Sequence, residues 1–334
     1  MRANRFAASL LAVLALVVPM NLVRAGPVED RASEIKKVLD DAHGDLSKKE
    51  QVQLFALLRA LTPLQRFRVL EILDRSQSTN VRKIHDRLSD ANKKELAALL
   101  KESGDAASAA SLQKVGVISD VDDTAIPTDF NPDDSDHFEG ARHFYDTLTR
   151  EPIHYVSARP GAFLPQTKAH LEKSGMPVGT FDTRSNVWGI LFGGEDDIEK
   201  SKVENIEKWL ALHPGQRFVF LGDTLQRDAE VYRTIRERHP DQVAAIFIHE
   251  AGGPKRDRNA YPGATFFNTY PEAEAVWVAH ENDPKPLAAL TPSGTHPVEK
   301  TEGFLSSTGD FFKDTGSVIK KGILSGIKKI GIGD

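Results

Sequence analysis

Three aspartates and a threonine follow an apolar run that has the composition of a buried strand. The run starts at Val115, and it leads into Asp120 and Asp122, two positions apart, with Asp123 and Thr124 directly after them. Buried carboxylates are costly unless a cation or a proton compensates them. The pattern therefore predicts a reactive site with a nearby cation at the end of a core strand. An acidic turn after such a strand is the alternative.

The chain after residue 113 alternates between strand and helix patterns. Strands are expected at residues 115–121, 153–157, 179–183, 217–221 and 243–249, and helices at residues 139–149, 162–173, 200–212 and 228–239. Such alternation predicts an α/β fold, with a doubly wound parallel sheet covered by helices on both faces. Ligands of these sheets bind beyond the carboxyl ends of the strands.

Further polar side chains fall at the same edge of the predicted sheet. Ser157 ends the second strand, Asp223 follows the fourth, and Asp228 comes five residues later. Lys202 adds a positive charge from the first turn of the helix expected at residues 200–212. An ordinary surface lysine is the alternative for this residue.

These side chains suit phosphoryl transfer. Asp120 is expected to attack phosphorus and form an aspartyl-phosphate, while Asp122 protonates the leaving oxygen and later takes a proton from water. Mg²⁺ is expected to bind the side chains of Asp120 and Asp223 and the backbone carbonyl of Asp122. Ser157 and Lys202 would contact the oxygens of the transferred group.

Three more residues are expected to support this chemistry. Asp228 would hold Lys202 or a metal-bound water beside the metal ligands. Thr124 and Arg159 are expected to contact the substrate phosphate. For Arg159, a surface charge is the alternative.

The ordered set resembles the four motifs of the haloacid dehalogenase (HAD) superfamily of phosphatases. The matching segments are Asp120-Val-Asp-Asp-Thr124, Ser157, Lys202 and Gly222-Asp-x4-Asp228. A closer likeness, through Gly222-Asp-Thr-Leu-Gln-Arg-Asp-Ala-Glu-Val-Tyr232, is to the actin-patch-type phosphatidate phosphatases and their bacterial relatives. This resemblance covers about residues 114–280. It implies Mg²⁺-dependent removal of phosphate from phosphatidate or a similar lipid.

Two motifs depart from that family. Its members carry Ser-x-Ser-Pro where this chain has Ser157-Ala-Arg-Pro160, and His-Lys where it has Ser201-Lys202. The departures leave the HAD chemistry in place and the lipid substrate open.

The expected site has no room for a cap domain. Residues 126–138 are too few to form the cap that the HAD resemblance implies, and an open site suits a bulky or membrane-embedded substrate. The apolar loop at residues 186–194 would offer Trp188, Leu191 and Phe192 to lipid. A further buried strand is the alternative for this loop.

Residues 30–113 form a predicted helical domain with no residues suited to chemistry. Ser47-Lys-Lys-Glu50 is a capping box and Thr62-Pro63 begins another helix. A further helix is expected at about residues 92–102. The small residues at 104–111 predict a linker to the following domain.

Both ends of the chain carry targeting or membrane-binding patterns. In residues 1–25, Arg2 and Arg5 precede a short apolar run, which predicts a cleaved signal peptide and export to a periplasm or beyond. A membrane anchor is the alternative. Residues 281–316 are a predicted linker, and residues 317–334 a basic amphipathic segment that contacts an anionic membrane or docks on protein.

Composition narrows the function further. The chain has 334 residues, a net charge of -5 and no cysteine. The negative charge disfavours nucleic-acid binding, and the lack of cysteine excludes disulfides and thiolate chemistry. The leading prediction is an exported Mg²⁺-dependent phosphatase. A broad-specificity phosphomonoesterase acting on nucleotides or phosphoproteins and a non-catalytic membrane-surface binding protein are the alternatives.

Overall fold

The computed structural model describes residues 27–42, 44–112, 114–128, 137–149, 151–177, 179–184, 195–252 and 257–282. The predicted signal segment, the apolar loop at residues 186–194 and the C-terminal amphipathic segment lie outside these residues, so the predictions made for them stay predictions. Among the described helices, none is long and apolar enough to cross a bilayer.

The α/β unit is built on one sheet of six parallel strands. These are β1 (Gly116–Ser119), β2 (Ile153–Pro160), β3 (Gly179–Arg184), β4 (Phe218–Asp223), β5 (Val243–His249) and β6 (Ala264–Phe267). Their order is β3-β2-β1-β4-β5-β6, and neighbouring strands pair in parallel. This confirms the predicted fold class. The strand order reverses between β1 and β4, which is the place where open α/β sheets bind ligands.

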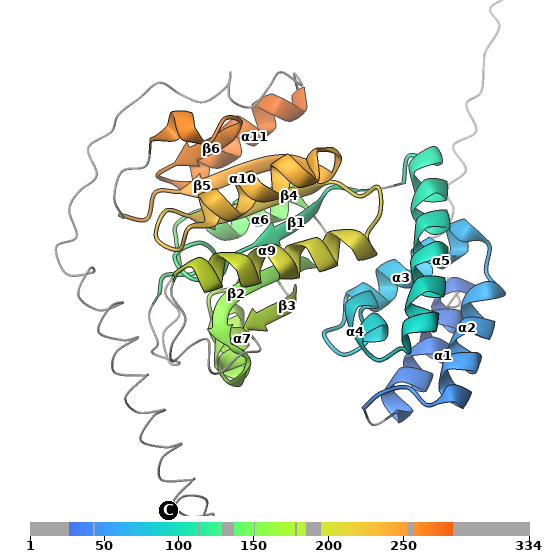
Figure 1. Cartoon of the computed structure of the whole chain (residues 1–334). Coiled ribbons are helices and arrows are strands. Elements are labelled where there is room, and N and C mark those ends of the chain that lie inside the picture. The colour runs from blue at the N-terminus through green and yellow to red at the C-terminus, as the bar shows by residue number, and fades with distance from the viewer. Residues whose placement is uncertain are drawn as a thin grey trace, which may run out of the picture.

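Helices cover both faces of this sheet (Figure 1). One face carries α6 (Ala141–Leu148), α7 (Leu164–Lys173) and α11 (Tyr270–Asn282), and the other carries α9 (Glu195–Leu212) and α10 (Asp228–Arg238). The strands supply apolar side chains to both. Val117 and Val219 belong to the core under the first set of helices, whereas Ile118 and Phe220 belong to the core under the second. Burial on both faces is typical of parallel sheets.

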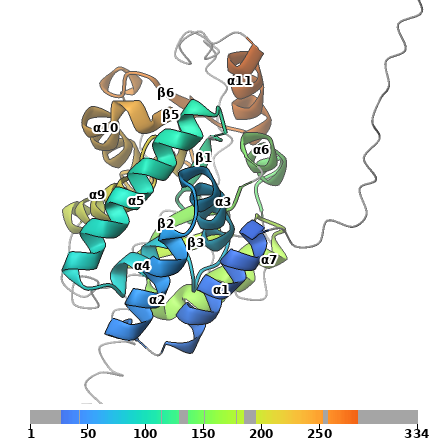
Figure 2. The ribbon, with the colours of Figure 1, turned by 90° about the vertical axis from the view of Figure 1, so that its right-hand side faces the viewer.

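A helical bundle precedes the sheet and has its own apolar core. Its helices are α1 (Pro27–Asp41), α2 (Lys48–Arg59), α3 (Pro63–Asp74), α4 (Val81–Asp86) and α5 (Asp90–Ala109). The bundle lies beside the α/β unit in Figure 1 and in front of it in Figure 2. The predicted capping box at Ser47 and Glu50 is confirmed, and Thr62 forms a second one with Gln65.

The linker predicted at residues 104–111 is wrong, because α5 continues to Ala109. Alanine has the highest helix propensity of any residue, so an alanine-rich stretch extends a helix readily. The small residues also permit close packing. A Cβ atom on Gly104 would lie 2.4 Å from the carbonyl oxygen of Pro214, which follows α9. The stretch therefore lets α5 approach the α/β unit.

Polar contacts join the bundle to β3, one of the two edge strands of the sheet. The Gln77 side chain accepts a hydrogen bond from the Phe181 N–H (2.7 Å) and donates one to the Phe181 carbonyl (3.2 Å). Arg82 lies 3.3 Å from the carboxylate of Asp182. Exposed strand edges invite unwanted pairing with other chains. The bundle thus protects this edge at Phe181.

Candidate active site

Asp120 lies directly after β1 and is fully buried. Its Oδ1 atom accepts a hydrogen bond from Lys202 at 2.8 Å, whereas its Oδ2 atom has no hydrogen-bond partner among the described residues. Burial raises the pKa of Asp120 to about 8; the charge of Lys202 opposes this rise, and the charge of Asp228 adds to it. The Oδ2 atom therefore requires a further positive charge to stay ionised at neutral pH.

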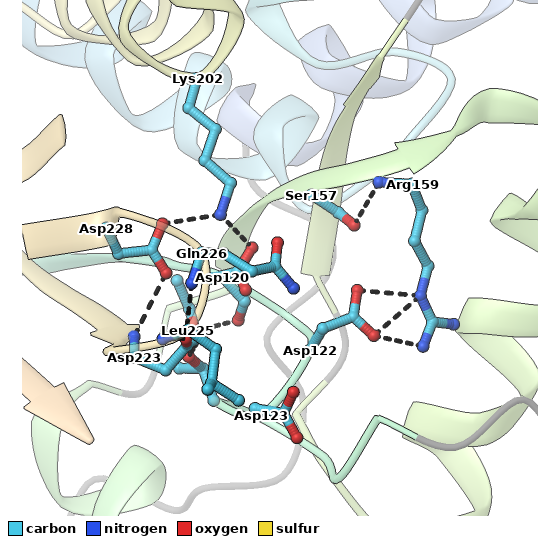
Figure 3. Close-up of polar contacts among 12 residues, drawn as sticks. Asp120, Asp122, Asp123, Ser157, Arg159, Lys202, Asp223, Leu225, Gln226 and Asp228 are labelled. Carbon is cyan, nitrogen blue, oxygen red and sulfur yellow. Dashed lines mark hydrogen bonds and ion pairs between the residues drawn. The ribbon is translucent and has the colours of Figure 1, made fainter. Parts of the chain in front are cut away.

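Lys202 reaches Asp120 from α9. This helix begins at Glu195, earlier than predicted, so Lys202 lies about two turns into it and not in its first turn. Asp197 in the first turn favours the earlier beginning, because its charge complements the helix dipole. The Lys202 ammonium donates to Asp120 and, at 2.6 Å, to Asp228 (Figure 3).

The two carboxylates keep Lys202 charged. Burial alone would lower its pKa, but the negative charges of Asp120 and Asp228 outweigh burial and raise the pKa above the ordinary value. Lys202 is therefore a buried cation and not a surface lysine. One of the two supporting roles predicted for Asp228, holding Lys202, corresponds to this contact.

Asp223 and Asp228 are fixed by the turn between β4 and α10. The Asp223 Oδ1 atom accepts hydrogen bonds from the N–H groups of Leu225 (2.5 Å) and Gln226 (3.1 Å). The Asp228 Oδ2 atom accepts one from the Asp223 N–H at 3.2 Å. Gly222 makes this packing possible, because a Cβ atom there would lie 2.5 Å from the Cβ of Asp228.

Three buried carboxylates meet at this point. Oxygen atoms of Asp120, Asp223 and Asp228 lie within 4.8 Å of one another. Burial, with the charges of the other two, raises the pKa of Asp223 well above its ordinary value. A cluster of this kind fits a hard divalent cation, which prefers oxygen ligands. The Asp120 Oδ2 atom has no hydrogen-bond partner among the described residues, which makes Asp120 the clearest ligand for the cation. The oxygens of Asp223 and Asp228 all accept hydrogen bonds, but only Asp228 is paired with the Lys202 ammonium, so Asp223 is the second side chain that would hold the cation.

Thr124 supports one of these two ligands. Its side chain is buried, and its hydroxyl donates to the Asp223 Oδ2 atom at 3.2 Å. The contact orients the Asp223 carboxylate. Binding of substrate by Thr124 stays a prediction.

Asp122 has a different set of partners. Arg159 Nε lies 3.0 Å from each Asp122 carboxylate oxygen, and Arg159 Nη2 also donates to Oδ1. Arg159 is 8% exposed, so it is not a surface charge. Ser157 is buried nearby, and its Oγ accepts from the Arg159 N–H at 3.1 Å. β2, expected to end at Ser157, runs on to Pro160 with an irregular register after Val156.

The turn after Asp122 is held by residues that no motif identified. Asp123 has a left-handed backbone conformation (φ 56°), which is strained for a residue with a side chain. His249 Nδ1 lies 2.8 Å from the Asp123 carbonyl, and the Tyr270 hydroxyl donates to the Thr124 carbonyl. These contacts come from 126 and 146 residues further along the chain, so local patterns carry no signal for them.

Tyr270→Phe is expected to reduce kcat about tenfold and the free energy of unfolding by about 1–3 kcal/mol, because a buried carbonyl loses its donor and the active-site turn loosens. Tyr155→Phe is the matched control. It also removes a hydrogen bond from a buried tyrosine to a backbone carbonyl, that of Pro177 at 3.0 Å. The control should lose stability and keep its kcat. Equal loss of kcat in both variants would contradict a positioning role for Tyr270.

Metal should stabilise the protein more at high pH than at low pH. The pKa of Asp120 rises on folding from 3.8 to about 8, so the metal-free folded state binds the extra proton in that range. Binding of this proton therefore stabilises the folded state fully below about pH 4, and the stabilisation is lost as the pH rises through about 8. A bound cation favours the ionised form. The increase in Tm on adding Mg²⁺ should be about 5 °C or more at about pH 8 and much smaller at about pH 5. A gain in Tm independent of pH would contradict this.

Residues 115–250 match the family model described as phosphatidate phosphatase APP1, catalytic domain. The match spans every predicted site residue, from Asp120 to Asp228, and it leaves out the helical bundle and Tyr270. Comparison with the curated proteins and with the solved structures gives no match. The match confirms the resemblance to the actin-patch-type phosphatidate phosphatases drawn from the motifs. Over residues 115–250 the α/β unit is accordingly similar to the catalytic domain of phosphatidate phosphatases.

Proposed function

We propose that the protein is an Mg²⁺-dependent phosphatase of the HAD superfamily that hydrolyses phosphatidate or a similar lipid phosphate through an aspartyl-phosphate at Asp120. One observation carries the proposal. The buried Asp120 shares Lys202 with Asp228 and lies within 4.8 Å of the Asp223 carboxylate, and its Oδ2 atom accepts no hydrogen bond from the part of the chain that the structure describes. This arrangement occurs inside the segment that matches a phosphatase domain.

In the first step, a carboxylate oxygen of Asp120 attacks the phosphorus atom. The new bond joins that oxygen to phosphorus, and the bond from phosphorus to the alcohol oxygen breaks. Asp122 gives its proton to the departing alcohol oxygen. The products of this step are the free alcohol and an acyl phosphate on Asp120.

In the second step, water attacks the same phosphorus atom. Asp122 takes a proton from the water, the bond from Asp120 to phosphorus breaks, and orthophosphate leaves. Asp120 returns to its carboxylate form and Asp122 to its protonated form. The cycle therefore needs no further reactant besides water.

Lys202 and Ser157 serve the phosphoryl oxygens. The Lys202 ammonium is held between Asp120 and Asp228, so it is already in place when negative charge spreads over those oxygens. Ser157 accepts a hydrogen bond from the Arg159 N–H and keeps its own hydroxyl hydrogen for a phosphate oxygen.

Asp120 and Asp223 would hold the divalent cation, with the backbone carbonyl of Asp122 as the third predicted ligand. When bound, Mg²⁺ supplies positive charge that offsets both the clustered carboxylates and the phosphate. Thr124 and the N–H groups of Leu225 and Gln226 fix the orientation of Asp223 for this purpose.

Two further parts of the proposal rest on sequence. The signal pattern of residues 1–25 supports export, and the basic amphipathic pattern of residues 317–334 supports contact with an anionic membrane. Both fit a substrate that resides in a bilayer.

The test is phosphate release by the purified protein with Mg²⁺ or with EDTA. The substrates are phosphatidate in vesicles, a nucleoside monophosphate and 4-nitrophenyl phosphate. We expect Mg²⁺-dependent release with a clear preference for phosphatidate. Equal or better turnover of the nucleotide would favour the broad-specificity phosphomonoesterase. Vesicle binding without release from any substrate would favour the non-catalytic membrane-binding protein.

A further inference from the structure

We propose that Arg159 is a positioning residue that holds Asp122 for proton transfer to the leaving alcohol, and that it does not bind the phosphate. The inference rests on the proposed function, because the role of Asp122 belongs to it. It replaces the substrate contact that the sequence led us to expect for Arg159.

The geometry of the ion pair carries the inference. The Arg159 guanidinium contacts both Asp122 oxygens, with Nε 3.0 Å from each and Nη2 donating to Oδ1 (Figure 3). A carboxylate held by two guanidinium nitrogens cannot turn freely, because the planar fork of arginine fixes the plane of the carboxylate as well as its distance. Both side chains are buried.

Thr167 anchors the other end of the guanidinium. Arg159 Nη1 donates to the Thr167 Oγ1 atom at 3.1 Å, and that hydroxyl donates to the Phe163 carbonyl at 2.9 Å. Since a hydroxyl has one hydrogen, the bond to Phe163 fixes its direction and leaves a lone pair toward Arg159. A residue of α7 therefore holds the Arg159 guanidinium in its orientation, and Arg159 in turn holds the Asp122 carboxylate.

The two cations of the site have separate partners. Lys202 contacts Asp120 and Asp228, the carboxylates around the predicted nucleophile, whereas Arg159 contacts Asp122, the predicted proton donor. The backbone of Arg159 is tied to Ser157 by a 3.1 Å hydrogen bond. Orientation of the proton donor is thus linked to the strand that carries the predicted phosphate contact.

Because Arg159 contacts the proton donor and not the nucleophile, its loss should slow the reaction most for substrates whose leaving oxygen must be protonated. An alkoxide is a poor leaving group, so release of an alcohol such as diacylglycerol depends on the proton from Asp122. Nitrophenolate leaves without one. General acid catalysis contributes about 10²–10⁴-fold where it is needed. A residue that binds phosphate would instead affect both substrates alike.

The test measures kcat and KM with Mg²⁺ for Arg159→Gln, Asp122→Asn and the double variant. The substrates are dioctanoyl phosphatidate and 4-nitrophenyl phosphate. Arg159→Gln should reduce kcat/KM, which reports the first step and not hydrolysis of the acyl phosphate, about 10–100-fold on the phosphatidate and less than about threefold on the nitrophenyl ester. In the Asp122→Asn background, adding Arg159→Gln should cause no further loss, because the two residues act as one unit. Additive losses, or equal losses on both substrates, would overturn the inference.

Two further variants keep the test independent of a folding defect in Arg159→Gln. Thr167→Val keeps the shape of the buried side chain and removes its hydrogen bond with Arg159. It should therefore also lose more activity on the phosphatidate than on the nitrophenyl ester, but by a smaller factor than Arg159→Gln. Arg159→Lys keeps the charge without the fork and should stay impaired on the phosphatidate. Full recovery by Arg159→Lys would mean that charge alone suffices, which contradicts positioning.

Binding provides a readout that does not depend on turnover. Calorimetric titration with orthophosphate and Mg²⁺ should give affinities within about twofold for the wild type and Arg159→Gln. A loss of tenfold or more would make Arg159 a phosphate ligand. If the wild type released phosphate from neither substrate, the proposed function would fail along with this inference. Activity with additive losses would remove this inference alone.

Discussion

Replacement of Asp120 with asparagine is expected to reduce phosphate release by at least about 1000-fold while the protein stays folded. The amide has nearly the shape of the carboxylate, but it does not attack phosphorus. The asparagine side chain also stays neutral beside the buried carboxyl groups of Asp223 and Asp228, so the variant should not lose the stability that a cavity would cost. The measurement is release of phosphate from phosphatidate with Mg²⁺, together with Tm.

Asp105→Asn is the matched control for this variant. Asp105 is an exposed aspartate of α5, paired with Lys101 at 2.7 Å on the surface. Its replacement should change neither kcat nor Tm appreciably, because exposed ion pairs contribute little. If Asp120→Asn kept more than about a tenth of the wild-type rate, Asp120 would not be the nucleophile.

Lys202→Met is expected to cost both activity and stability. The change leaves Asp120 and Asp228 without the ammonium that both contact, and removal of one partner from a buried ion pair costs about 3–5 kcal/mol. Loss of the charge near the phosphoryl oxygens should reduce kcat about 10²–10³-fold. Tm and kcat with Mg²⁺ are the measurements.

Lys208→Met is the control, because Lys208 lies on the same helix with its side chain exposed. It should behave as the wild type in both measurements. The loss of stability in Lys202→Met should also grow above about pH 8, where Asp120 of the wild type, whose pKa is raised to about 8, is ionised and the charge of Lys202 stabilises it. A variant with normal Tm at neutral pH would show that the buried carboxylates do not depend on Lys202.

Much of the candidate site could be predicted from the positions at which the strands end in the sequence. Asp120 directly follows β1 and Asp223 ends β4. These strands are neighbours in a parallel sheet, so their carboxyl ends lie at one edge. The prediction needed only the alternation of strands and helices and the rule that such edges bind ligands. Gly222 and Asp228 were visible as part of the same motif.

Other contacts depend on side-chain direction, which the sequence does not encode locally. Arg159 looked equally suited to the phosphate or to solvent, and only packing against Asp122 and Thr167 gives it a partner. His249 and Tyr270 contact the turn after Asp122 from β5 and α11, elements that no catalytic motif singles out. Such contacts are set by the assembled sheet.

The helical bundle also contains tertiary contacts that local sequence patterns do not predict. Small residues near Gly104 favoured a linker, because alanine, glycine and serine are common in both linkers and tightly packed helices. The close approach of α5 to Pro214 is a tertiary constraint that makes the second choice correct. The contact between Gln77 and the edge strand at Phe181 likewise has no sequence signature.

The central claim is that Asp120 carries the phosphoryl group during turnover, and trapping that group tests it most directly. The wild-type protein with Mg²⁺ is mixed with phosphatidate labelled with radioactive phosphorus and quenched in acid within milliseconds. We predict label on the protein that hydroxylamine releases, as expected of an acyl phosphate, and that maps to the peptide containing Asp120. Steady turnover with no trapped label, or with label on another residue, would contradict the account.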